Sequence, residues 1–241
     1  MWPPVPACGC KREFLPLEGA LPVHLYRCAR VLTLAILAIG VPAGASADDA
    51  AELRLRLRIN MYDYAGIKAR VRAAAVAATQ RVYGAIGVDI EWIEQCPAGC
   101  RRGFRPPSQI DTTGAELTVI MLTSTTRVRE VARASMGSAP IGSRVVYAFF
   151  EQIRTFASDR GLGAGQVLGH VIAHEIGHRL LRDGHGPEGL MRSEWIRADV
   201  SDIAVGRLGF TPAQGQRIRA TVDELIRART QRYEEYRNST R

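Results

Sequence analysis

Two histidines four residues apart, with a glutamate directly after the first, carry the clearest chemistry in this sequence. They are His174, Glu175 and His178, which together match the short pattern HExxH. On a helix, residues four apart lie about 40° apart around the axis, so both imidazoles can face one metal ion. Glu175 is rotated from His174 by about 100°. Its carboxyl is therefore expected beside the ion, where it can act as general base for a water molecule.

A third imidazole follows once the expected helix ends. The apolar run Val167–Ala173 indicates a buried helix, and a turn at residues 183–184 would end it. His185 then lies on a segment that can fold back and supply the third ligand. Nearby carboxylates leave an alternative open, with Asp183, Glu188 or Glu194 as the third ligand. We predict a Zn²⁺ site with His174, His178 and His185 as ligands and one position left for water.

Two more residues of this stretch need an interpretation. His170 lies one turn before His174, where a fourth ligand would close the site to water, and we expect it to pack beneath the helix instead. Met191 ends a tight turn and is expected to form an apolar floor under the metal, because a thioether is a poor zinc ligand beside imidazoles. The alternative to the whole site is a core helix that happens to carry histidines, but buried His and Glu without partners are costly.

The stretch 174–191 resembles the zinc site of the metzincin peptidases, and within them the matrixin type. That pattern is HExxHxxGxxH followed by a turn with a methionine. His174 and His178 match the first two ligands, Glu175 matches the general base, and Met191 matches the Met-turn methionine. Residues 52–220 also resemble a group of uncharacterised secreted bacterial proteins with an HEIGH…H…GLM segment.

This chain departs from the metzincin pattern at two positions. Leu181 stands where the pattern has glycine, and His185 comes one residue later than the third histidine. The resemblance implies a zinc metallopeptidase that hydrolyses peptide bonds through a zinc-activated water, with Glu175 as general base. Two other functions remain open. One is a secreted binding or scaffold protein with a catalytically silent zinc site, and the other is a zinc hydrolase of non-peptide amides.

The composition suits one globular domain. The chain has 241 residues, of which 46% are hydrophobic, and a formal net charge of +8. Its basic residues are scattered and form no block with interleaved aromatics, so we expect no nucleic-acid partner. We predict a single, monomeric catalytic domain over residues 48–241, with a peptide or protein as substrate.

Residues 1–47 have the features of a signal peptide or leader. Arg27 and Arg30 precede the apolar run Val31–Val41, and Ala45-Ser46-Ala47 offers a cleavage site before Asp48. The run is short for a transmembrane helix. We therefore expect a secreted or periplasmic protein without stable membrane insertion after cleavage. An uncleaved N-terminal anchor is the alternative.

Removal of that leader would leave only two cysteines, Cys96 and Cys100. An even pair in an exported chain favours a disulfide. A metal site at this pair is the alternative, but no histidine or second cysteine pair lies near it in the sequence.

The elements around the site follow from periodicity and turn residues. Alternating or apolar runs predict strands at 52–60, 88–93, 117–122 and 144–150, with 117–122 central in the sheet. Helices are expected at 67–86, 127–134, 151–158 and from Thr211-Pro212 to about Tyr236, with a long loop at 94–114 and a glycine hinge at 161–165. The predicted fold class is α/β (α+β) and metzincin-like. It has a mixed twisted sheet, a long backing helix, an active-site helix, a Met-turn and a C-terminal helix. The predicted sheet edge for substrate is Val145, Val146, Tyr147 and Ala148.

Overall fold

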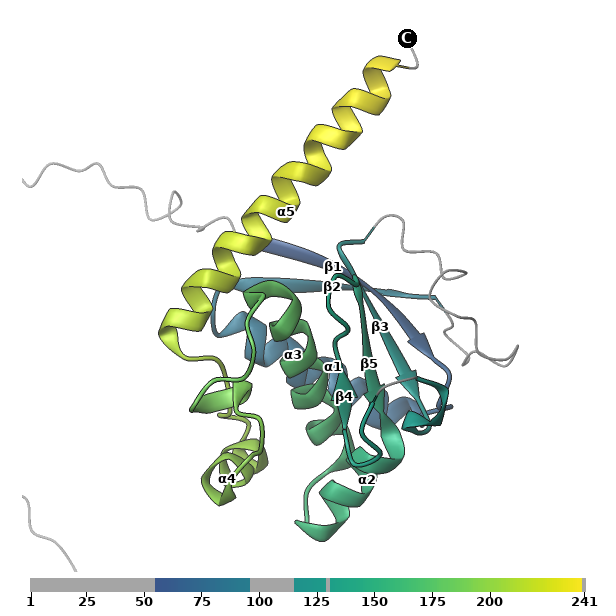
Figure 1. The fold of residues 1–241 in the computed structure, drawn as a ribbon, viewed down its shortest axis with the longest axis vertical. Helices are drawn as coiled ribbons and strands as arrows, with labels where there is room; N and C mark the ends of the chain where they lie inside the picture. Colours follow the sequence, from purple (N-terminus) through teal and green to yellow (C-terminus); the bar gives the residue numbers. More distant parts are fainter. Residues whose placement is uncertain (1–54, 96–114, 129–130, 240–241) are drawn as a thin grey trace, which may run out of the picture. The chain divides into compact units, whose positions relative to one another are not determined.

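The structure is a computed structural model that describes residues 55–95, 115–128 and 131–239 (Figure 1). These residues belong to one compact unit, Ala47–Arg241. The predicted leader, residues 1–47, lies outside the described residues, as do Cys96 and Cys100 with their predicted disulfide. No helix in the described ranges is both long and apolar enough to cross a lipid bilayer.

A five-stranded, mostly parallel sheet carries the rest of the fold. Its strands lie in the order β2-β1-β3-β5-β4, and only β4 is antiparallel to its neighbour, β5. Both faces of β3 are buried, which explains its unbroken apolar run and confirms its predicted central position. The strands are β1 (Leu55–Asp63), β2 (Val88–Glu94), β3 (Leu117–Leu122), β4 (Gly137–Ser138) and β5 (Val145–Phe149).

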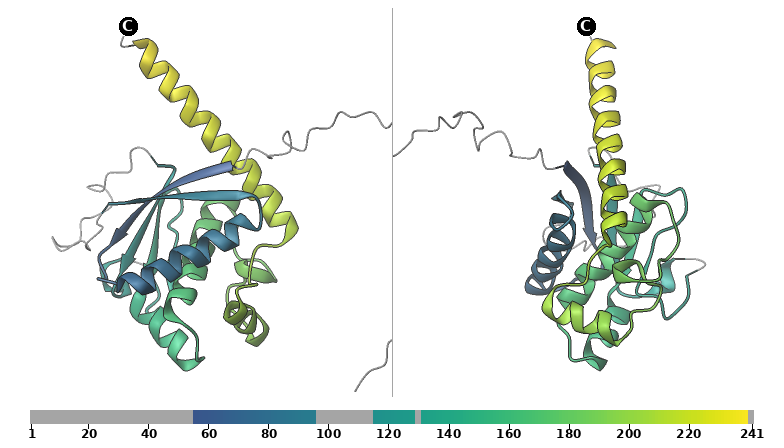
Figure 2. Two further views of the ribbon diagram at one scale, coloured as in Figure 1. Left: turned by 180° about the vertical axis from the view of Figure 1, so that it is seen from behind. Right: turned by 90° about the vertical axis from the view of Figure 1, so that its left-hand side faces the viewer.

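The described chain also contains five α-helices and two short 3-10 helices (Figure 2). They are α1 (Ala69–Gly84), η2 (Thr125–Arg127), α2 (Phe150–Asp159), α3 (Ala164–Leu181), η3 (Gly189–Met191), α4 (Arg197–Val205) and α5 (Pro212–Ser239). α1 and α3 share one core with the same face of β1, β3 and β5. The predicted mixed α/β architecture, with a long helix behind the sheet and a separate site helix, is confirmed.

One local prediction is wrong, and two elements of the structure were not predicted. The expected helix at 127–134 is wrong, because η2 ends at Arg127 and residues 131–136 contain no helix. The strand β4 and the helix α4 were not expected from the sequence. β4 has only two residues, Gly137 and Ser138, too few to show an alternating pattern.

Glycines let α3 lie directly against α1. A Cβ atom at Gly169 would lie 2.5 Å from the carbonyl oxygen of Ala75, so only a hydrogen fits there. Thr79 and Tyr83 of α1 donate hydroxyl hydrogen bonds of 3.0 and 3.1 Å to main-chain carbonyls of α3. Gly165 makes the same kind of close approach to α1. The predicted glycine hinge therefore ends before Gly165, which belongs to the packed helix.

The predicted edge strand requires a correction. β5 lies between β3 and β4, and β4 is the last strand of the sheet on that side. The four residues predicted as an open edge are buried, and two of them pair with β4, Tyr147 with Ser138 and Ala148 with Gly137. On this side of the sheet, β4 is the one described strand with an edge to which a further strand could add. The four predicted residues are Val145, Val146, Tyr147 and Ala148.

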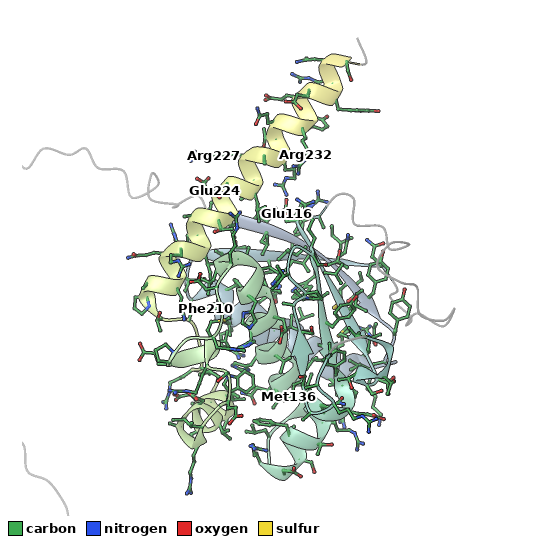
Figure 3. All side chains as sticks on the ribbon, viewed as in Figure 1. Glu116, Met136, Phe210, Glu224, Arg227 and Arg232 are labelled. Carbon is green, nitrogen blue, oxygen red and sulfur yellow. The ribbon has the colours of Figure 1, made fainter. Side chains whose placement is uncertain are left out.

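The C-terminal helix α5 begins at the predicted residues. The Thr211 hydroxyl accepts a 3.3 Å hydrogen bond from the Gln214 amide, and the Gln214 side chain accepts one of 3.0 Å from the Thr211 amide, a reciprocal cap. Further along, Arg229 donates a 2.6 Å hydrogen bond to the buried carboxylate of Glu116. Glu116 is labelled next to α5 in Figure 3. α5 is thus tied to the start of β3, while residues 231–239 are exposed.

Candidate metal centre

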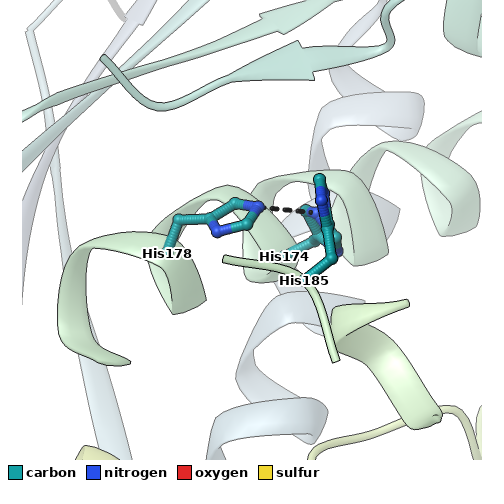
Figure 4. A group of neighbouring side chains, drawn as sticks. All are labelled: His174, His178 and His185. Carbon is teal, nitrogen blue, oxygen red and sulfur yellow. Dashed lines mark hydrogen bonds between the residues drawn. The ribbon is translucent and has the colours of Figure 1, made fainter. Parts of the chain in front are cut away.

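Three histidine rings meet beside the C-terminal half of α3 (Figure 4). His174 and His178 lie one turn apart on α3, and His185 reaches the same point from the following segment. The ring centroids are 4.7 Å apart for the first two, and His185 lies 5.3 Å from His174 and 4.8 Å from His178. One possible ligand atom from each ring lies within 4.8 Å of the others. The structure thus brings together the three histidines that the sequence singles out.

The chain reverses after α3 in a turn that α5 holds in place. α3 ends at Leu181, and Arg182 adopts a left-handed conformation with φ 58°, which takes the chain out of the helix. Arg217 of α5 donates a 3.0 Å hydrogen bond to the Leu181 carbonyl and pairs with the Asp183 carboxylate at 2.5 Å. These contacts fix the turn that lets His185 fold back toward the helix.

The hydrogen bonds of the rings determine which nitrogens face each other. Nδ1 of His174 lies 2.7 Å from the Leu190 carbonyl oxygen, and Nδ1 of His178 lies 3.2 Å from that of Asp183. A carbonyl can only accept, so each Nδ1 carries the proton and each Nε2 of a neutral ring presents a lone pair. The two Nε2 atoms are 3.0 Å apart. Two facing lone pairs repel each other unless a cation lies between them.

Burial disfavours an additional proton on either of these two rings. It lowers the pKa of His174 to about 4, and it also lowers the pKa of His178. Both rings are therefore neutral at pH 7, the form that binds metal. Nitrogens that share one tetrahedral zinc lie roughly 3.3 Å apart, close to the 3.0 Å separation of this pair. The three imidazoles fit a divalent transition metal, with zinc among several that favour such ligands.

Glu175 lies next to the histidines but outside the ligand group. Its side chain is buried, and this burial raises the pKa of its carboxyl to about 8, although the nearby Arg179 guanidinium acts in the opposite direction. The backbone of β4 covers it, since a Cβ atom at Gly137 would overlap the Glu175 carboxyl. The carboxyl is thus largely shielded from solvent, and a cation bound nearby would favour its ionised form.

Arg179 holds that cover in place. Its guanidinium donates hydrogen bonds of 2.6 Å to the Pro140 carbonyl and 2.8 Å to the Ala139 carbonyl, both in the segment between β4 and β5. Arg179 lies one turn after Glu175 on α3. That spacing was the only sign in the sequence that this arginine belongs to the site.

The other candidate ligands do not join the group of three histidines. Asp183 is engaged by Arg217, and neither Glu188 nor Glu194 joins the three histidines within ligand distance. His170 is fully buried, with Nδ1 2.8 Å from the Gln166 carbonyl oxygen. Among the described residues, the metal-binding group therefore consists of three imidazoles.

Met191 is buried at the end of η3 and packs under α3. A Cβ atom at Gly177 would lie 2.6 Å from the Met191 sulfur. Gly177, between the two ligands of the helix, thus leaves space for the thioether, a role the sequence did not reveal. Two further unpredicted contacts involve Leu190, whose carbonyl accepts hydrogen bonds from His174 and from the Trp195 indole at 3.1 Å.

A cleft of about 1250 Å³ opens over the histidines and Glu175. β4 and the segment after it form one wall, α3 forms the floor, and the segment around Trp195 forms the opposite wall. A single small ligand would fill only part of this space, because pockets for drug-sized molecules measure about 300–1,000 Å³.

Comparisons with known proteins add no family to this description. No family model matches the chain, and no curated protein is significantly similar to it. The assignment of function rests on the site itself.

Proposed function

We propose that the protein is a zinc-dependent peptidase of metzincin type. The observation that carries this proposal is the buried Glu175 carboxyl beside three converging imidazoles, at the floor of an open cleft. A purely structural zinc site has four protein ligands and needs no base. The buried Met191 beneath α3 supports the likeness to the metzincin arrangement.

In this proposal His174, His178 and His185 hold the zinc ion. When bound, zinc supplies a Lewis acid that polarises a carbonyl and lowers the pKa of water toward about 7. Glu175 accepts the proton of the attacking water at a carboxylate oxygen and delivers it to the leaving amine. β4 covers one side of that carboxylate, while the cleft opens over Glu175 and the histidines. Arg179 keeps the cover in place through its carbonyl contacts.

The substrate is an extended peptide that adds to the sheet at β4. In the described part of the chain β4 is the last strand on that side, and its inner edge is already paired with β5. Main-chain hydrogen bonds to the outer edge would align the peptide along the cleft. Export through a leader that ends at Ala47 is part of the proposal, and N-terminal sequencing of the mature protein tests it.

The variant Glu175→Gln tests the peptidase proposal. It keeps the shape of the side chain and removes the base, so we expect stoichiometric zinc and a loss of peptide hydrolysis of at least about 100-fold. Turnover on a peptide library would be compared for wild type and variant, both zinc-loaded. Equal turnover would overturn the role of Glu175. Zinc binding without turnover in the wild type would favour a binding protein with a silent site.

A further inference from the structure

Three arginines in the cleft have no carboxylate partner among the described residues. They are Arg144 at the start of β5, Arg160 directly after α2 and Arg182 at the end of α3, and all three are exposed and line the cleft. Within residues 55–95, 115–128 and 131–239, none of them forms an ion pair. Their charges are available to a ligand.

Two of the four acidic residues of the same lining are paired with arginines of α5. Arg229 of α5 pairs with Glu116 at 2.6 Å, and Arg217 pairs with Asp183 at 2.5 Å. The lining holds four acidic residues in all against five arginines. Glu194 is the remaining exposed carboxylate in the lining. The cleft is therefore electropositive before any metal binds.

Arg160 and Arg182 lie beyond opposite ends of α3, and Arg144 lies toward the Arg182 end, because the carbonyl of the preceding Ser143 accepts a hydrogen bond from Arg179. Arg182 follows the last residue of α3, whereas Arg160 precedes its first residue, Ala164, by only four positions. A helix of 18 residues is roughly 27 Å long, a distance that about eight residues of extended peptide span. At the second end Arg160 packs on the Phe156 ring at 3.8 Å, which restricts its side chain near the opening.

We infer that the cleft selects peptide segments with acidic side chains on both sides of the metal centre. Arg160 receives an acidic side chain at one end, and Arg144 and Arg182 receive one at the other. This inference rests on the proposed function, since it takes the occupant to be an extended peptide. It adds the substrate class, which the metal site alone does not specify.

Binding of labelled peptides tests this inference without turnover. The probes are three decapeptides of one sequence with Glu, Gln or Lys at the two flanking positions, measured by fluorescence anisotropy on zinc-loaded Glu175→Gln. We expect the Glu peptide to bind at least about tenfold more tightly than the Gln peptide at low salt, and the Lys peptide most weakly. The preference should weaken as salt is added.

Charge-reversal variants test which arginines cause the preference for the Glu peptide. Arg160→Glu and the double variant Arg144→Glu/Arg182→Glu should each weaken binding of the Glu peptide and improve binding of the Lys peptide, by about two- to fivefold for each arginine. Glu194→Gln should strengthen binding of the Glu peptide. The matched controls are Arg154→Glu on α2 and Arg70→Glu on α1, two exposed arginines outside the cleft lining.

Several results would overturn the inference. One is equal binding of the three peptides. Another is an effect of Arg154→Glu or Arg70→Glu as large as that of the cleft variants. A third is a ten-nucleotide DNA strand that competes for the cleft as strongly as the Glu peptide does. A charge preference that follows the cleft arginines supports it even when the wild type cleaves none of these peptides. In that case only the hydrolytic proposal fails.

Discussion

Nδ1 of His174 lies 2.7 Å from the main-chain carbonyl oxygen of Leu190, so the turn that carries Met191 also orients the first candidate metal ligand. The same carbonyl accepts a 3.1 Å hydrogen bond from the Trp195 indole. The Trp195 ring also meets the His174 ring edge to face, with centroids 6.2 Å apart. The Leu190 carbonyl thus links α3, the turn that carries Met191 and the cleft segment around Trp195.

Trp195→Phe tests this link. The variant keeps an aromatic ring and removes the N–H group that fixes the Leu190 carbonyl. Partners that orient metal ligands affect affinity by about 10–100-fold. Because the lost N–H group acts through Leu190 and the aromatic ring beside His174 is kept, we expect a smaller loss of zinc affinity, about threefold, measured by competition with a chelator. Trp92→Phe is the control, since Trp92 lies on β2, and an equal loss there would argue against the link.

Gly177→Ala tests the space that α3 leaves for Met191. The added methyl would lie 2.6 Å from the Met191 sulfur and 2.9 Å from the Phe210 ring. We expect the free energy of unfolding to fall by about 1–3 kcal/mol, measured by urea denaturation. Met191→Ala in the same chain should recover part of that loss, because it removes the sulfur. Strictly additive losses in the double variant would contradict the contact.

Gly169→Ala tests the close packing of α3 on α1. Here the methyl would meet the main chain of α1, 2.5 Å from the Ala75 carbonyl oxygen, and the backbone cannot move aside as a side chain can. We expect a loss of about 3 kcal/mol and a melting temperature lower by about 6–12 °C. Gly84→Ala is the matched control, because nothing lies within 4 Å of the added methyl. It should be neutral or stabilising by up to about 1 kcal/mol.

The pKa of Glu175 predicts a pH dependence for the metal-free protein. Its carboxyl has a pKa raised from 4.5 to about 8 by burial, so the folded state holds a proton that the unfolded state releases. The contribution of this carboxyl to stability should therefore be lost as the pH rises from 4.5 through 8. Glu175→Gln lacks this proton. We expect equal melting temperatures at pH 4.5 and a variant more stable by roughly 10 °C at pH 8.5. A constant difference across this range would refute the raised pKa.

The sequence predicts the ligands and most elements because both depend on local spacing. His174 and His178 share one helix face through their separation of four residues, and the continuous apolar run of β3 identifies a strand buried on both faces. The prediction that residues 145–148 form the sheet edge was wrong, because β4 has only two residues and is recognised only by its pairing with β5. Likewise, Leu190 contributes a main-chain carbonyl, which no side-chain pattern encodes, and Arg217 acts from α5, far along the chain.

The position of His185 is the central claim, and zinc stoichiometry tests it most directly. The protein would be loaded with zinc, dialysed and analysed for metal as wild type, His185→Ala, Asp183→Ala and Glu194→Ala. We predict one zinc per chain in the wild type and in both carboxylate variants, and a weakened site that loses its zinc on dialysis in His185→Ala. Stoichiometric zinc retained by His185→Ala, or lost only from a carboxylate variant, would contradict the account.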